Sequence, residues 1–406
     1  MDSKIFIDGC ESGFNAEAQS RRDAQSGEID ISGALPQTPT IDSKEQNISQ
    51  SESSLRSSAS LRLCVKNAPT THCVRKIKRI FDGDKVIEAE HINGYLMDGP
   101  DAWVESRTKP ICDVPVMVYG NKPTDGGYLF LTKEEKDEVL EREPEISRFI
   151  KQIYGATEYI NNTKRYCLWL VGASPAEIRK SKFILERIEN VRKFRLNSTK
   201  AQTRESAETP TLFQEIRQPN SNYIIIPRHS SENRNYIPFG FVSSEIIVND
   251  AVQILPSASL YHFGVLTSSV HMAWMRTVCG RLKSDYRYSA NIVYNNFPWP
   301  EVGERGDSEI TPNLQNSQSP SNESNKSLRQ KIESTAQSIL DARALYPDSS
   351  LADLYDPLTM PIELRKAHAA NDAAVMKAYG YSPSMTEPEI VVDLMTRYQK
   401  LTMANS

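Results

Sequence analysis

The richest mixture of charges and rings in the chain is the stretch GRLKSDYRYSANIVYNNFPWP, residues 280 to 300. Its first half alternates Arg281, Lys283, Asp285 and Arg287 with uncharged residues. In an extended strand, the two-residue period would place all four charges on one face. Lys and Arg donate to guanine O6 and N7, and Asp accepts from cytosine N4, so this row suits the reading of base edges in DNA. The competing interpretation is an exposed strand with neighbouring ion pairs.

Within this row, Lys283 and Asp285 form the pair with the most specific chemistry. One donates and the other accepts, which matches the two halves of a G·C pair. Arg281 and Arg287 flank the pair, where they could contact phosphates or a neighbouring guanine. We assign Tyr286, which lies between them, to the same candidate DNA surface.

A basic segment upstream offers a second candidate surface. Residues 164 to 204 contain eleven Lys or Arg against three Glu. Its apolar positions are Ile184, Leu185, Ile188 and Val191, on one helical face. A run of this kind tracks DNA phosphates in one interpretation and is a solvated helix face in the other. We choose Arg192, Lys193 and Arg195 as its candidate DNA contacts.

No catalytic, metal-binding or cofactor-binding pattern is found in the sequence. Its six cysteines include no Cys-x-x-Cys pair, so they indicate reduced thiols in a cytosolic protein. The histidines are dispersed. There is no glycine-rich nucleotide loop, no Gly-x-Ser-x-Gly elbow and no His-Glu-x-x-His. We therefore assign no catalytic residue, no metal ligand and no cofactor site to this chain.

Composition limits the classes of protein that remain. The chain has 406 residues, 39% hydrophobic residues, a net charge of −4 and a mean hydropathy of −0.50. Any affinity for DNA must then come from a local patch rather than from the whole surface. No signal peptide or membrane-spanning run is present, which favours a cytoplasmic location without a membrane partner.

The chain divides by composition into five parts. Residues 1–70 are polar and rich in Ser and Gln, which predicts a disordered leader, and residues 303–327 read as a flexible linker. Between them, residues 71–110 precede a globular domain that spans 111–302. Residues 328–406 form a helical C-terminal domain.

The globular part mixes the periods of strands and helices, which predicts an α+β fold without regular βαβ alternation. Strands are expected at 114–120, 165–171, 222–227 and 244–250. Helices are expected at 132–155, 174–198, 259–278, 327–347, 361–380 and 386–402. Thr132 and Ser174 are predicted N-caps, and Pro144 should divide the first helix. The last three helices should form a bundle or a layer on the central domain. Phe297 and Trp299 are expected to form a buried aromatic–proline plug.

Several ordered blocks resemble the MmeI-like DNA methyltransferases, which are single-chain restriction–modification enzymes that modify adenine. These blocks include INGYLMDGPDAWVESR, GNKPTDGGYLFLTKEE, IPRHSSENRNYIPFGF, LYHFGVLTSSVHMAWMRTVCGRLKSDYRYSANIVYNNFPWP and LADLYDPLTMPIELRKAHAANDAAV. The resemblance covers about residues 71 to 400. It implies the end of a methyltransferase domain (71–110), a DNA target-recognition domain (111–302) and a C-terminal helical region.

The chain departs from that family at the chemistry of methyl transfer. Adenine methyltransferases hold the flipped base with an Asn/Asp-Pro-Pro-Tyr/Phe motif, which does not occur here, and the cofactor-binding glycines are also absent. S-adenosylmethionine is a cofactor of the full-length family, but this chain alone is expected neither to bind it nor to methylate. We expect double-stranded DNA as a partner and a separate catalytic methyltransferase chain as a second. The alternative is a structural or protein-interaction remnant without affinity for DNA.

Overall fold

The computed structural model describes residues 78–82, 84–302 and 320–404. The predicted leader, 1–70, and the larger part of the predicted linker, 303–319, lie outside the described residues. Residues 320–327, assigned to that linker from composition, instead begin a long helix at Pro320.

Four sheets form within the described residues, and three of them combine strands from separate parts of the sequence. The central antiparallel sheet has the order β3 (Val118–Tyr119), β11 (Val252–Pro256), β7 (Tyr223–Pro227) and β9 (Gly240–Val242). A second sheet has the order β10 (Ile247–Val248), β5 (Ile150–Tyr154), β6 (Tyr166–Leu168) and β4 (Phe130–Leu131). A small sheet joins β12 (Gly280–Leu282), β13 (Asp285–Arg287) and β8 (His229–Ser230). The fourth sheet is the hairpin of β1 (Lys78–Asp82) and β2 (Lys85–Ala89).

Each of the four predicted strand segments contains a strand, and each observed strand is shorter than the predicted segment. β7 has the sequence YIIIP and is buried along its whole length, as expected for a run of β-branched residues with partners on both edges. Because β7 pairs with both β11 and β9, the strand forms the centre of its sheet.

The helices of the central region begin where the capping residues predict. Thr132 starts α1 (Lys133–Arg142) and Ser174 starts α3 (Pro175–Ile178), each through a capping box. The remaining helices here are α2 (Ala156–Asn161), α4 (Lys182–Leu196), α5 (Ala201–Glu205), α6 (Leu260–Leu266) and α7 (Ser269–Val278). Short 3-10 and π turns cover η1 (Pro144–Phe149), η2 (Ser206–Glu208) and η3 (Ala290–Tyr294).

Three helix predictions need correction. The segment expected as one helix from 132 to 155 breaks before Pro144, as predicted, but its end is the strand β5, which pairs with both β6 and β10. The segment from 174 to 198 divides into α3 and α4, because Ser181 caps a new helix. The segment from 259 to 278 divides into α6 and α7 for the same reason, since Ser268 accepts a hydrogen bond from the His271 amide.

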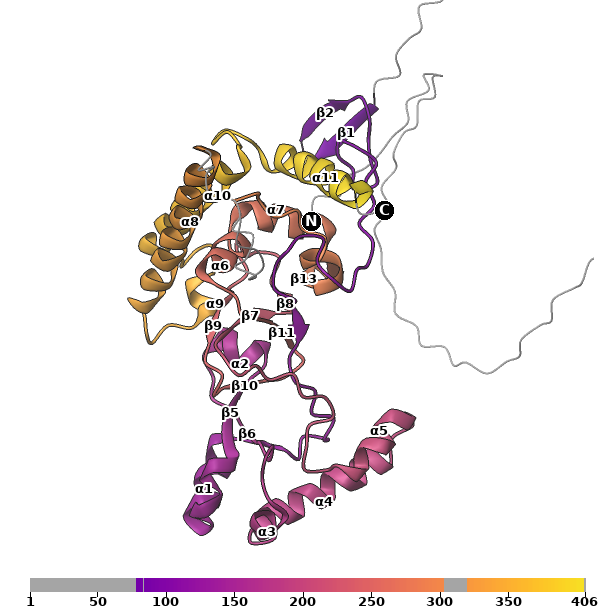
Figure 1. Ribbon diagram of the computed structural model, residues 1–406, viewed down its shortest axis with the longest axis vertical. Coiled ribbons are helices and arrows are strands. Elements are labelled where there is room, and N and C mark those ends of the chain that lie inside the picture. The colour runs from indigo at the N-terminus through magenta and orange to yellow at the C-terminus, as the bar shows by residue number, and fades with distance from the viewer. Residues whose placement is uncertain (1–77, 83, 303–319, 405–406) are drawn as a thin grey trace, which may run out of the picture. The chain divides into compact units, whose positions relative to one another are not determined.

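The C-terminal helices are α8 (Pro320–Ala344), α9 (Leu351–Leu354), α10 (Ile362–Tyr379) and α11 (Glu387–Ala404). They share one apolar core with α6 and α7, so they form a layer on the central domain, which is the second of the two predicted arrangements. α8 packs against α10 and α6, and α11 packs against α7 (Figure 1). The approach of α6 to α8 requires Gly264, since a Cβ there would lie 2.7 Å from the Ile332 methyl Cγ2.

The predicted α+β fold with a small helical C-terminal region is therefore confirmed. Within the described ranges, no helix is long and apolar enough to cross a membrane. The same ranges contain no cluster of His, Cys, Asp and Glu arranged to hold a metal ion.

Candidate DNA interface

The charged row of the opening stretch forms the tip of a β-hairpin. β12 and β13 are joined by a two-residue turn, Lys283 and Ser284, and Arg281 lies opposite Tyr286. The turn requires a positive φ at its first residue, and Lys283 adopts it with φ of +55°. Through β13 the hairpin also pairs with β8, where Tyr286 lies opposite Ser230.

The predicted single extended strand is wrong, and so is the prediction that all four charges share one face. Opposed residues of a hairpin lie on the same face, and neighbours in sequence alternate. Asp285 and Arg287 therefore share one face, Arg281 lies on the other with Tyr286, and Lys283 is in the turn. The turn could not be read from the alternating charges, because it contains no glycine, asparagine or aspartate.

The charged side chains at the tip differ in how strongly they interact with neighbouring groups of the protein. Arg281 donates to the Ser284 carbonyl at 2.8 Å, lies 3.6 Å from a Glu232 oxygen and covers the Tyr286 ring at 4.2 Å. The side chains of Lys283 and Arg287 are exposed and have no hydrogen-bond or ionic partner among the described residues. Asp285 is exposed and accepts only a long 3.4 Å hydrogen bond from the Glu232 amide. Lys283, Asp285 and Arg287 are therefore the side chains available to an external ligand.

Two tyrosines anchor this tip to the protein core. Tyr286, which was assigned to the DNA surface, is buried beneath Arg281, so that assignment is wrong: its ring supports the hairpin and does not reach outward. Tyr288 is also buried and its hydroxyl lies 2.9 Å from Nε2 of His271 in α7. Burial lowers the pKa of His271 to about 3, so the imidazole stays neutral at physiological pH.

α7 provides a rigid base for the hairpin, and its last residue, Val278, lies two residues before β12. The indole of Trp274 is fully buried and donates to the Val293 carbonyl at 3.0 Å. At the other end of α7, the Ser269 amide donates to Asp372 of α10 at 2.7 Å. Asp372 also accepts from the Tyr236 hydroxyl at 2.6 Å, so one carboxylate joins α7, α10 and the loop after β8.

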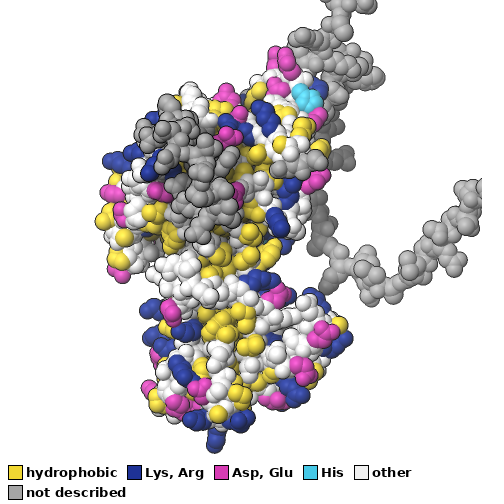
Figure 2. Space-filling model, viewed as in Figure 1, with side chains coloured by type: hydrophobic (Ala, Val, Ile, Leu, Met, Phe, Trp, Pro, Cys, Tyr) yellow, Lys and Arg dark blue, Asp and Glu magenta, His cyan; other side chains and the backbone are white. Residues whose placement is uncertain are grey.

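The second candidate surface is the exposed side of α4. Arg192 and Lys193 are both exposed there, and Lys193 lies 3.7 Å from Glu189, one turn earlier. In Figure 2, Lys and Arg side chains surround the part of the surface that carries α3 to α5, with acidic side chains among them. The basic segment therefore forms a surface of mixed charge that carries individual exposed cations.

Arg195 is not part of that surface, so its assignment as a DNA contact is wrong. Its side chain is fully buried, and the guanidinium donates five hydrogen bonds to backbone carbonyls. The accepting carbonyls and distances are Thr124 at 3.0, Pro123 at 2.9, Ser206 at 2.8, Thr209 at 3.0 and Leu212 at 2.7 Å. The helical spacing could have predicted this burial, because Arg195 is four residues after Val191 on the apolar face of α4.

Sequence reasoning missed two residues, Arg228 and His229, whose backbone adjoins the hairpin at the start of β8. Arg228 accepts through its carbonyl from the Tyr288 amide at 2.8 Å, and His229 lies opposite Arg287. Burial lowers the pKa of His229, as do the cations Arg228 and Arg287, so this ring is neutral at physiological pH. The block PRHSSENRN, polar and adjacent to a buried strand, was the available signal.

The aromatic–proline end of the opening stretch is a plug, as predicted. Phe297 is fully buried and Trp299 is nearly so. The Phe297 ring contacts His271 edge-on at 4.5 Å and lies 5.7 Å from the Trp299 ring. The plug therefore packs against the same face of α7 that holds Tyr288.

Comparison with known proteins places these elements in a family context. The model of the MmeI target recognition domain matches residues 98–301, and that of the MmeI C-terminal domain matches 324–404. DNA methyltransferase A of Bacillus subtilis (strain 168) is 37% identical over 325 residues, which are 80% of this chain and 34% of that protein. This chain therefore spans about a third of the length of that relative.

The type IIL restriction–modification enzyme MmeI, solved in complex with DNA, aligns with a TM-score of 0.70 at 45% identity, covering 79% of this chain and 40% of that one. The type IIG restriction endonuclease BpuSI aligns with a TM-score of only 0.33 at 11% identity, covering 72% of this chain and 31% of that one.

Proposed function

This chain belongs to the MmeI family, whose target recognition and C-terminal domains it contains, and we propose that it reads DNA sequence through the β12–β13 hairpin. A similar protein was solved in complex with DNA, which supports double-stranded DNA as the ligand. The observation that carries the proposal is the hairpin tip, where exposed charges without strong internal partners are held on a buried base.

The charged tip of the β12–β13 hairpin has the chemistry for the major groove, which admits a two-stranded β-ribbon. At its tip Lys283 donates to guanine O6 or N7, and Asp285 accepts from N4 of the paired cytosine. Such a base contact discriminates against wrong bases by about 1–3 kcal/mol. Arg287, on the same face as Asp285, contacts a phosphate or a neighbouring guanine.

Contacts with phosphates contribute affinity without sequence preference. Arg192 and Lys193 on α4 are the proposed contacts of this type. Since the net charge of the chain is −4, these local cations supply the electrostatic attraction. Affinity should therefore fall steeply as salt rises, because each phosphate contact releases counterions.

Methyl transfer itself belongs to another polypeptide in this proposal. An adenine-N6 methyltransferase must hold a flipped base and S-adenosylmethionine, and the sequence contains neither the base-binding motif nor the glycine-rich cofactor motif. The chain thus supplies the specificity of a restriction–modification methyltransferase and works with a separate catalytic chain. The free thiols of Cys112, Cys167 and Cys279 support a cytoplasmic location.

The test is selection of binding sites from a random duplex pool at low salt, with the double variant Lys283→Glu, Asp285→Arg beside the natural chain. The variant should change the preferred base at one position and leave the other positions unaltered. Arg192→Ala is the control, because loss of a phosphate contact weakens binding to all sequences alike. An unchanged preference with uniform loss of affinity would show that the tip does not read bases. No binding to any duplex at low salt would favour the structural remnant.

A further inference from the structure

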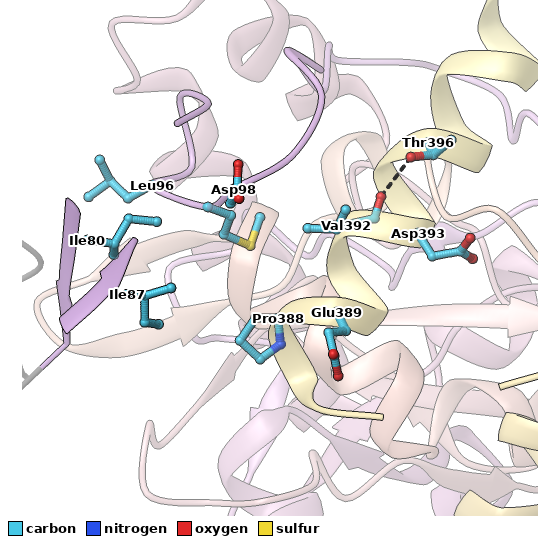
Figure 3. Close-up of a pocket in the computed structure, with 10 residues that line it drawn as sticks. Ile80, Ile87, Leu96, Asp98, Pro388, Glu389, Val392, Asp393 and Thr396 are labelled. Carbon is cyan, nitrogen blue, oxygen red and sulfur yellow. Dashed lines mark hydrogen bonds between the residues drawn. The ribbon is translucent and has the colours of Figure 1, made fainter. Parts of the chain in front are cut away.

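A groove of 470 Å³ lies at the junction of the β1–β2 hairpin, the turn before residue 98 and α11 (Figure 3). Ile80 and Ile87 point into it from the hairpin, and Val392 lines it from α11. Leu96, Met97 and Pro388 complete the apolar lining. The groove therefore presents aliphatic surface from two parts of the chain, residues 80–97 and residues 388–392, that are far apart in the sequence.

The carboxylates at the groove are already engaged by this chain. Asp98 accepts from the His91 amide at 2.9 Å, and Glu389 accepts from the Thr386 amide at 2.7 Å. Asp393 accepts from Arg397 at 2.5 Å. Because these charges have internal partners, the groove suits apolar side chains of a protein better than a small charged ligand.

The hairpin beside the groove exposes more apolar surface than its size can support alone. β1 and β2 form a two-stranded sheet without a third strand among the described residues, and such a hairpin is marginally stable in isolation. Val86 is 54% exposed and Ile87 is 44% exposed. Nearby, the Trp103 ring lies against Gly94 in the turn that carries Leu96, and this tryptophan is 70% exposed. An exposed aromatic beside an apolar groove is typical of a protein interface.

The comparisons indicate what covers this surface. The match to the Bacillus subtilis DNA methyltransferase includes 325 residues of this chain, so it begins no later than residue 82, within the hairpin. Residues 324–404 match a C-terminal domain, and two thirds of that relative lie outside the match. The unmatched part of the relative therefore precedes the hairpin and joins the matched part there.

We infer that the groove, the β1–β2 hairpin and Trp103 form the docking surface for the part of a DNA methyltransferase that precedes the matched region. This inference rests on the proposed function, in which that part is a separate polypeptide. Ile87, Val392 and Trp103 are the central contacts. The partner inserts aliphatic side chains into the groove and packs on the exposed side of the hairpin.

The experiment uses the full chain and, as the probe, the Bacillus subtilis relative from its start to the beginning of the match, after circular dichroism and a cooperative thermal transition have shown that this probe is folded. Isothermal titration calorimetry should show association, weakened at least tenfold by Ile87→Lys and by Trp103→Ala. Both side chains are exposed, so neither change should unfold the protein. The matched control is Leu358→Lys, at a side chain that is 93% exposed and does not line the groove, and it should leave the affinity unchanged.

Three results would overturn the inference. One is the absence of association, and another is association that neither variant weakens. The third is a different occupant, which self-association of the chain that Ile87→Lys abolishes would reveal. Site selection by the Ile87→Lys chain separates this inference from the proposed function. We expect the Ile87→Lys chain to lose docking and to select the same DNA sites as the natural chain. If the natural chain docks but selects no DNA sites, only the proposed reading of DNA is refuted.

Discussion

Replacing Arg195 by Met should destabilise the protein severely, although its neighbours on α4 can be replaced freely. The change removes five hydrogen bonds from a charged donor and leaves five carbonyls without it in a buried site. A hydrogen bond to a charged group contributes about 1.5–3 kcal/mol, and part of that sum is offset because the guanidinium no longer has to be desolvated. We expect a net loss of about 3–5 kcal/mol, in the range reserved for breaking a buried network.

The assay is urea unfolding of the full chain followed by circular dichroism, with Arg192→Met and Lys193→Met as matched controls. Both controls are exposed on the same helix and should change the unfolding free energy by less than about 0.5 kcal/mol. They should instead weaken binding to all DNA sequences and reduce the salt dependence by about one counterion each. If Arg195→Met lowers the unfolding free energy no more than the controls do, the guanidinium does not bind the five carbonyls, and the structural role assigned to Arg195 is refuted.

Two further predictions concern pH and activity. Burial lowers the pKa of His262 to about 4 and of His271 to about 3, so the unfolded chain takes up protons below pH 6.5 that the folded chain does not. The free energy of unfolding should be highest above pH 6.5 and should fall towards pH 4 by up to about 1.4 kcal/mol per pH unit for each ring. A free energy from urea unfolding that does not change over this range would contradict the prediction. The chain alone should also transfer no methyl group from labelled S-adenosylmethionine to DNA, and incorporation that survives removal of host methyltransferases would disprove this.

The sequence predicted those elements whose cause is local. The capping boxes at Thr132 and Ser174 depend on residues three apart, and the buried strand at 223–227 depends on its own composition. The segment 150–154 was mistaken for helix because its strand character comes from pairing with β6 and β10, which no local pattern contains. Tertiary pairing overrides propensity in such cases.

In the candidate site too, the sequence predicted what depends on residue type and failed where tertiary structure decides. The exposed charges at Lys283, Asp285 and Arg287 were found from residue types, and their role in reading bases stays a prediction. Their relative orientation was wrong, because a turn without the usual residues reverses the chain at Lys283. Arg195 was misassigned because the carbonyls that surround it come from two separate loops, which meet only in the folded protein.

The shared core of the central and C-terminal helices has a consequence for synthesis on the ribosome. α7 carries the hairpin, yet its face is covered by α11, whose last residues are made more than a hundred residues later. At about 5–20 residues per second, this interval lasts roughly 6–25 s. During that time the apolar side of α7 lacks its partner, so the hairpin cannot reach its final support until α11 has been made. The nascent chain should therefore be a client of chaperones that bind exposed apolar helices.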